Sequence, residues 1–198
     1  MSGLLLIISG PSGAGKGTVV KELVKDDQYA LSISATTRTA REYEQHGREY
    51  FFNTREEFAQ LIKDDMLLEY AEYVGNCYGT PKAYVEEQIA QDRIVILEIE
   101  VEGALQVKAK FPDAVLVFLV PPSMEELERR LQGRNTETQE VIDFRLTKAR
   151  QEMNQLQMYD HVVLNDEVNL ATAKINQIVA TERVKTYRNQ SNLTKNPI

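Results

Sequence analysis

A glycine-rich stretch with a single lysine, at residues 10–18, is where residue types and spacing most directly suggest chemistry. Its letters fit the pattern Gly-x-x-x-x-Gly-Lys, an apolar run precedes it, and apolar residues at helical spacing follow it. Glycines leave backbone N–H groups free to turn around an anion, and a following helix adds the positive end of its dipole. The pattern predicts a strand, a helix and between them a nucleotide phosphate loop, made of Gly10, Pro11, Ser12, Gly13, Ala14, Gly15, Lys16, Gly17 and Thr18.

The lysine of this loop, Lys16, is expected to act as a point charge on the β- and γ-phosphates of a bound nucleotide. The usual pattern places Ser or Thr directly after the lysine to hold Mg²⁺, but here that position is Gly17, and Thr18 follows. The Mg²⁺ contact is therefore expected either from the Thr18 hydroxyl or from water held by a carboxylate. Glu98, which ends a later apolar run, is the candidate carboxylate.

The composition of the 198-residue chain limits its partners and its compartment. With 23 basic against 30 acidic residues the net charge is −7, which argues against DNA or RNA as a partner. A single cysteine, Cys77, excludes an internal disulfide and fits a reducing compartment. The apolar run at residues 4–8 is too short for a signal peptide or a membrane span, so we expect a soluble cytoplasmic protein with no membrane partner.

Apolar runs that alternate with helical patterns indicate the fold class. The runs lie at residues 4–8, 94–97, 115–120 and 162–164. Such near-continuous runs suit strands that are covered by helices on both faces. Helical spacing occurs at residues 84–91, 125–131, 141–156 and 171–184. The alternation predicts an α/β fold of three layers with a central parallel sheet, and the length predicts one domain.

Two segments depart from the alternation of strands and helices. Residues 34–80 indicate short strands at 50–52 and 69–74 around one helix at 55–63, and we expect this segment to be inserted at one end of the sheet. Further on, Ser123 is expected to cap a helix, with Glu126 three residues later as in a capping box. In that helix we expect a surface ion pair for Arg129 but not for Arg130.

Seven blocks of sequence after the phosphate loop resemble guanylate kinases, and they occur in the family's order. The blocks lie at residues 34–41, 47–52, 68–73, 78–81, 97–103, 121–123 and 133–138. The Gly-Lys-Gly-Thr variant of the loop also resembles nucleoside monophosphate kinases more widely, adenylate kinase among them. From about residue 4 to residue 166 the chain therefore resembles a guanylate kinase.

This resemblance implies an activity and a division of the chain. The activity is reversible transfer of the ATP γ-phosphoryl group to GMP, and also to dGMP, with Mg²⁺, giving ADP and GDP in purine nucleotide metabolism. The fold is that of a P-loop kinase whose core carries an inserted mixed α+β GMP-binding subdomain and a helical lid. The implied boundaries are core at 1–34, 85–122 and 155–188, GMP-binding subdomain at 35–84, lid at 123–154 and a polar tail at 189–198. ATP and GMP are the expected partners of a monomer or homodimer.

The resemblance also implies roles for individual residues. The residues that match the grip on the GMP phosphate are Arg38, Arg41, Tyr50 and Tyr78, and those around the guanine are Ser34, Glu69, Thr80 and Glu100. Asn165 matches a contact to ATP, and the lid arginines that act with Lys16 are Arg130, Arg134 and Arg145. Two arginines and two phenolic hydroxyls suit a compact dianion. The alternative is a solvated loop for the two arginines and core or rim positions for the two tyrosines.

Some positions depart from the family pattern, and two other functions compete. Many relatives have Asp where this chain has Glu98 and Glu100, and Tyr43 stands where a glycine is usual. Adenylate kinase or a sugar-phosphate kinase would share the phosphate loop, but not the set formed by Ser34, Glu69 and residues 78–80. A non-catalytic protein-binding module would have no need of Lys16 or of an arginine lid.

Overall fold

The computed structural model describes residues 3–73, 75–133 and 138–189, and its centre is a five-stranded parallel sheet. In spatial order the strands are β2 (Tyr29–Leu31), β7 (Ile94–Glu98), β1 (Leu4–Ser9), β8 (Val115–Val120) and β9 (His161–Leu164). The strand before the glycine-rich loop therefore lies in the middle, between β7 and β8. The predicted central parallel sheet is confirmed.

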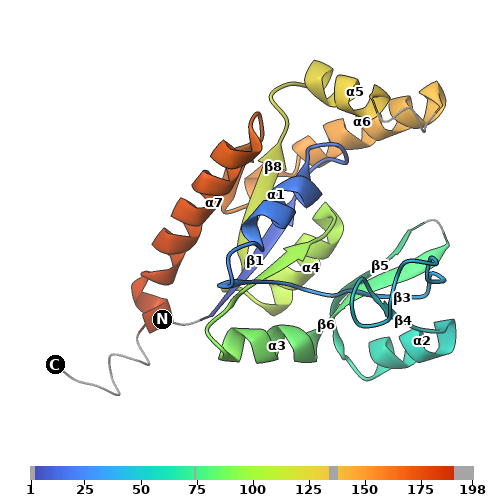
Figure 1. The fold of residues 1–198 in the computed structure, drawn as a ribbon, viewed down its shortest axis with the longest axis vertical. Helices are drawn as coiled ribbons and strands as arrows, with labels where there is room; N and C mark the ends of the chain where they lie inside the picture. Colours follow the sequence, from blue (N-terminus) through green and yellow to red (C-terminus); the bar gives the residue numbers. More distant parts are fainter. Residues whose placement is uncertain (1–2, 74, 134–137, 190–198) are drawn as a thin grey trace.

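Helices cover both faces of this sheet and make three layers (Figure 1). Because side chains alternate along a strand, Leu4 and Leu6 of β1 share a buried cluster with α1 (Lys16–Leu23) and α7 (Val168–Arg183). On the opposite face Leu5 and Ile7 share a cluster with α3 (Lys82–Ala90) and α4 (Val101–Lys110). All six residues of β1 are buried, which explains its continuous apolar run.

A second sheet lies beside the core, with strand order β4-β3-β6-β5 (Figure 1). We call it, with its helix, the small sheet unit: β3 (Ala35–Thr36), β4 (Phe51–Phe52), α2 (Arg55–Lys63), β5 (Leu67–Tyr73) and β6 (Asn76–Pro81). Helix α2 begins with a capping box, in which Thr54 and Glu57 each accept from the other's backbone N–H. Phe58 of this helix packs with Ala35 and Leu67 in a small hydrophobic core that belongs to the small sheet unit.

Helix α4 connects the small sheet unit to the core. The side-chain amide of Gln106 donates to the backbone carbonyl of Tyr70 and accepts from the Tyr70 N–H, both at 3.3 Å. Lys110 donates to the backbone carbonyl of Leu67 at 3.1 Å, and Leu68 is buried within the core cluster under α3 and α4. The edge of β5 is therefore covered, and the small sheet unit has a fixed attachment.

Two further helices, α5 (Met124–Gln132) and α6 (Gln139–Met153), form what we call the helical pair. Their shared cluster consists of Leu127, Leu131, Ile142, Leu146 and Ala149. The predicted cap at Ser123 is confirmed, because its hydroxyl accepts from the Glu126 N–H at 3.1 Å. The other half of the expected capping box is not formed, since the Glu126 carboxylate binds Arg129 and Arg130 instead, at 2.7 Å each.

The structure corrects several expected boundaries. Helix α6 ends at Met153 and not at Leu156, because the helical spacing continues into a separate 3₁₀ turn at Leu156–Met158. Helix α7 begins three residues earlier than expected. The elements missed by the sequence pattern are β2, β3, α4 and β6. The strands β2 and β3 are too short to show a period, and the buried face of α4 includes Gly103 and Ala104, which give a weak apolar signal.

Among the described residues no helix is both long and apolar enough to cross a bilayer.

Candidate active site

A cleft of about 240 Å³ lies where the glycine-rich loop, the end of β7 and the small sheet unit meet. Its walls include predicted site residues from six separate stretches of the chain. They are Lys16, Ser34, Tyr50, Glu69, Tyr78, Glu98 and Glu100. The carboxyl ends of β1 and β7 both point to this edge of the sheet, where ligands of α/β folds commonly bind. The fold thus gathers these residues into one concave site.

The glycine-rich loop requires its glycines for conformation and for space. Gly10, Gly13 and Gly15 have φ angles of 140°, 95° and 90°, a region that side chains disfavour. A Cβ on Gly10 would stand 2.2 Å from the Leu119 carbonyl oxygen, and one on Gly15 would stand 2.4 Å from Nδ2 of Asn165. That same Nδ2 donates to the Ala14 carbonyl at 2.7 Å. Asn165 therefore supports the loop from behind.

Lys16 begins helix α1 and turns its ammonium group back to the loop. The ammonium donates to the backbone carbonyl oxygens of Gly10 and Pro11, the latter at 3.2 Å. Burial lowers the pKa of Lys16, while the carboxylates of Glu100 and Glu98 oppose that shift. A cation with little water around it is thus held at the loop by carbonyl dipoles and two acidic neighbours.

Glu98 lies directly against the start of α1. A Cβ placed on Gly17 would stand 3.5 Å from Glu98 Oε1, so the carboxylate faces the position where the usual loop pattern has a hydroxyl. Burial raises the pKa of Glu98, and Lys16 opposes the rise. Thr18, the next residue along the helix, is exposed. A carboxylate and a hydroxyl supply oxygen ligands of the kind Mg²⁺ prefers, so this corner fits that ion.

Among the described residues, no larger set of metal ligands accompanies Glu98 and Thr18. In the ranges that the structure describes, no three or more His, Cys, Asp and Glu side chains gather around one point that could hold a metal ion. An ion at Glu98 and Thr18 would therefore take most of its ligands from phosphate oxygens and water, as Mg²⁺ in phosphoryl-transfer sites does.

Glu69 lines the cleft, and Thr80 lies beside it as its hydrogen-bond partner. Both side chains are buried, and the Thr80 hydroxyl donates to Glu69 Oε1 at 2.7 Å. On the other side, a Cβ on Gly103 would stand 2.8 Å from Glu69 Oε2, so α4 approaches the carboxylate with bare backbone. Burial raises the pKa of Glu69, and the hydrogen bond from Thr80 opposes the rise. The Glu69 carboxylate is thus buried in the wall of the cleft and held in place by Thr80.

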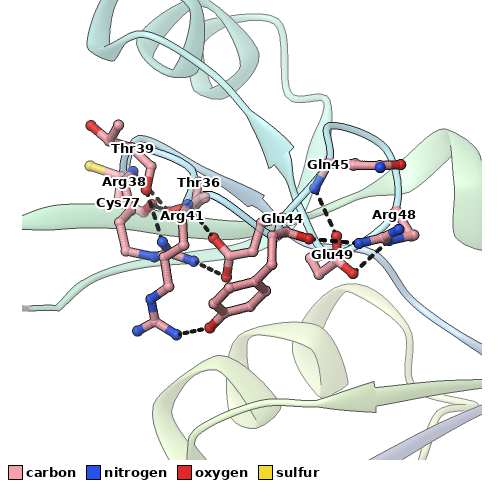
Figure 2. Close-up of polar contacts among 10 residues, drawn as sticks. Thr36, Arg38, Thr39, Arg41, Glu44, Gln45, Arg48, Glu49 and Cys77 are labelled. Carbon is pink, nitrogen blue, oxygen red and sulfur yellow. Dashed lines mark hydrogen bonds and ion pairs between the residues drawn. The ribbon is translucent and has the colours of Figure 1, made fainter.

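The two arginines of the loop before Tyr50 lie differently from each other (Figure 2). Arg38 donates to Glu44 Oε1 at 2.8 Å, and its guanidinium carbon lies 5.3 Å from the centre of the Tyr50 ring. Arg41 is exposed, donates to the Tyr43 hydroxyl at 2.9 Å, and is not among the residues that line the cleft. The loop thus places Arg38 beside the cleft wall and Arg41 outside.

Glu44 organises this loop and was missed by the sequence analysis. Its second oxygen accepts from the Arg41 backbone N–H at 2.8 Å, so one carboxylate ties both arginine positions together (Figure 2). The hydrogen bonds from Arg38 and from that N–H hold the pKa of Glu44 below its ordinary value. The stretch with Arg38, Arg41 and Arg48 also contains Glu42 and is followed by Glu49, so the sequence held no signal that singled out Glu44.

Of the helical pair's arginines, Arg130 reaches the glycine-rich loop. It donates to the Ala14 carbonyl of the loop at 3.5 Å, to Glu126 at 2.7 Å and to the backbone carbonyl of Asn165 at 3.1 Å. The ion pair expected for Arg129 is confirmed, but the expectation of none for Arg130 is wrong, because Glu126 lies one helical turn before both. Arg145 lies half-buried on α6, and Arg134 lies outside the described residues.

The fold and this cleft define a nucleotide-binding α/β domain with a phosphate loop, and comparison with known proteins narrows the class. The guanylate kinase family model matches residues 2–182. A crystal structure of guanylate kinase from Anaplasma phagocytophilum is similar with a TM-score of 0.76 and 32% identity, over 94% of this chain and 89% of that chain. The chain belongs to the guanylate kinase family, and that family implies a nucleoside monophosphate kinase.

A second solved structure is similar in fold only. The crystal structure of TT1252 from Thermus thermophilus gives a TM-score of 0.54 at 16% identity, over 93% of this chain and all of that chain.

Proposed function

We propose that this protein transfers the γ-phosphoryl group of ATP to GMP, giving ADP and GDP, and that it also accepts dGMP. A phosphate oxygen of GMP forms the new bond to the γ-phosphorus, and the bond from that phosphorus to the β–γ bridging oxygen breaks. No general base is required, because the attacking phosphate is already an anion. The work of the protein is then positioning and electrostatic stabilisation. Such a reaction serves purine nucleotide metabolism.

The observation that carries the proposal is the buried carboxylate of Glu69, which lines the same cleft as Lys16 and is held by a hydrogen bond from Thr80. Guanine presents two donors on one edge, N1–H and the exocyclic N2–H₂, beside the O6 acceptor. A carboxylate accepts from both donors, and the Ser34 hydroxyl, which also lines the cleft, can donate to O6. Adenine presents an acceptor at N1, which would face a carboxylate lone pair and leave Glu69 buried with the Thr80 hydroxyl but with no donor from the base.

We place the GMP phosphate near the aromatic end of the cleft. The rings of Tyr50 and Tyr78 meet edge to face with centroids 6.2 Å apart, and the Arg38 guanidinium lies against Tyr50. Phenolic hydroxyls and a guanidinium are suitable donors to a phosphate dianion. Arg41, which points away in this structure, would have to leave Tyr43 to join them.

On the donor side, the loop N–H groups and the Lys16 ammonium would hold the ATP phosphates. Lys16 would exchange its bonds to the loop carbonyls for phosphate oxygens. Arg130 and Arg145 from the helical pair would add positive charge over the transferring group, and Arg134 is proposed for the same role. Glu98 and Thr18 would hold Mg²⁺, which when bound neutralises charge on the phosphate oxygens.

A set of parallel assays tests the proposed substrate. ATP is offered with each of GMP, dGMP, AMP, UMP and CMP, and ADP release is measured. We expect GMP to be preferred to AMP by at least about a thousandfold in kcat/KM, because a buried hydrogen-bonding site rejects an analogue that lacks the matching groups. Comparable rates with AMP would reassign the protein to adenylate kinases, and no transfer to any nucleotide would favour a non-catalytic module.

A further inference from the structure

Glu100 lines the cleft, but its side chain makes no capping hydrogen bond to the helix that it begins. It occupies the N-cap position of α4, where an acidic side chain commonly accepts from the first free N–H groups of the helix. The Glu100 side chain makes no such cap bond, and its surface is half exposed. A carboxylate that is not used as a cap and is partly solvated needs another partner if it is to keep one orientation.

The partner comes from the helical pair, 48 residues along the chain. Lys148 of α6 donates to Glu100 Oε2 at 2.9 Å, and its ammonium lies 3.6 Å from the carboxylate of Glu152, one turn further along the same helix. Glu152 is 8% exposed, so this cluster reaches from the surface into the packed base of α6. Glu100, Lys148 and Glu152 thus form one ion cluster across two elements.

Lys148 and Glu152 lie behind Glu100 as seen from the cleft. They line a second hollow, between α4 and α6, to which Glu100 also contributes. Neither of them lines the cleft that holds Glu69 and Lys16, whereas Glu100 does. Lys148 can therefore act on a ligand in the cleft only indirectly, through its contact with Glu100.

We propose that Lys148 is a positioning residue, which holds Glu100 in the wall of the cleft so that this carboxylate is ready to accept from the guanine of GMP. This inference rests on the proposed function. Holding the carboxylate in advance removes part of the ordering cost that binding would otherwise meet. Because Arg145 lies one turn before Lys148 on α6, the same contact fixes the helix that carries a proposed phosphate contact.

The test compares Lys148→Met with Lys148→Arg and with Arg150→Met. Met keeps the length of the stem and loses the charge, Arg restores a donor, and Arg150 is an exposed cation on the same helix outside the cluster. We expect Lys148→Met to raise KM for GMP about fivefold, the scale of a partly exposed ion pair, with kcat and KM for ATP within about twofold. Lys148→Arg should recover most of the loss, and Arg150→Met should match the unmutated protein.

A double-mutant cycle separates positioning from general structure. If Lys148 acts through Glu100, Lys148→Met should cost little further GMP affinity in a Glu100→Gln background. Calorimetric titration with GMP alone supplies the affinities, and Lys148→Gln repeats the cycle should the Met variant fail to fold.

The outcomes distinguish the inference from the proposed function. Additive losses in the cycle, or equal losses for GMP and ATP, would overturn the positioning role. An unchanged KM for GMP in Lys148→Met, with a normal GMP kinase as starting protein, would overturn this inference alone. An unmutated protein that neither binds nor phosphorylates GMP would overturn both.

Discussion

The carboxylate of Glu98 lies against the backbone of Gly17, within 3.5 Å of where a Cβ on that glycine would stand. Strand β7 thus places the Glu98 carboxylate beside Gly17, the position where the usual loop pattern has a Ser or Thr hydroxyl. The Glu98 carboxylate therefore faces the start of α1 at Gly17, and Thr18 lies one residue further along the helix; both Glu98 and Thr18 are exposed.

From this relationship we predict that Glu98→Gln raises the Mg²⁺ concentration needed for half-maximal activity by about tenfold, because a carboxylate near a bound ion typically matters on that scale. Thr18→Val should raise it less. Titration of the rate with Mg²⁺ at fixed ATP and GMP measures both. If Thr18→Val has the larger effect, the hydroxyl is the principal protein contact and Glu98 is secondary.

Lys16→Ala should keep the fold and lower turnover by at least about a hundredfold, since one preorganised electrostatic contact to the reacting group is worth that much. Lys21→Ala, which removes an exposed cation from the same helix, is the matched control and should keep normal turnover. Circular dichroism verifies that both variants are folded. A folded Lys16→Ala protein with near-normal turnover would contradict the proposed role of the loop.

Glu69→Gln should lose most of the preference for GMP over AMP, because an amide cannot accept from both guanine donors, while KM for ATP should change little. The unmutated protein should also lose kcat/KM for GMP as the pH falls through the raised pKa of Glu69, above the ordinary value of 4.5. Protonation removes the acceptor, so the loss lies on the acid side. Selectivity that survives Glu69→Gln would place guanine recognition elsewhere.

A stability prediction concerns Glu182, a buried acid of α7. It accepts from Lys185 at 2.7 Å and lies 3.0 Å from His161 Nε2. Burial alone would raise its pKa, but the hydrogen bonds from Lys185 and His161 outweigh it, so the pKa is lowered from 4.5. A lowered pKa contributes stability above the unfolded value and loses it as the pH falls through the folded value.

Glu182→Gln should therefore reduce the free energy of unfolding by about 1–3 kcal/mol at pH 7, the cost of weakening a buried polar partner. The difference from the unmutated protein should shrink as the pH falls through the lowered pKa of Glu182, below its ordinary value of 4.5, because the native carboxylate itself then becomes protonated. Urea unfolding at several pH values measures it, with the exposed Glu86→Gln as control. A difference independent of pH would show that packing and not charge is responsible.

The parts of the fold that sequence could predict are those set by local pattern. The apolar run of β1 and the glycines after it determine strand, loop and helix within 20 residues, so they were readable. Lys16 and Glu98 were predicted from local pattern, but the other predicted residues of the cleft were matched through resemblance alone, because nothing local links Glu69 to Lys16. The partners that hold them were not predictable: Glu44 and Lys148 differ from ordinary surface acids and lysines only through what the folded chain places beside them.

The central position of β1 also determines the order in which the molecule can be built. Leu4 pairs with Ile94 on one side and Leu6 pairs with Val115 on the other, so β1 has no neighbour until Ile94 has been made, and lacks its second neighbour until Val115 has been made. Within the small sheet unit, by contrast, Glu72 pairs with Cys77 as soon as both are made. Distant pairings slow folding and keep apolar strands exposed meanwhile. We therefore expect the glycine-rich loop, which directly follows β1, to take its shape only after the strands on both sides of β1 have been made.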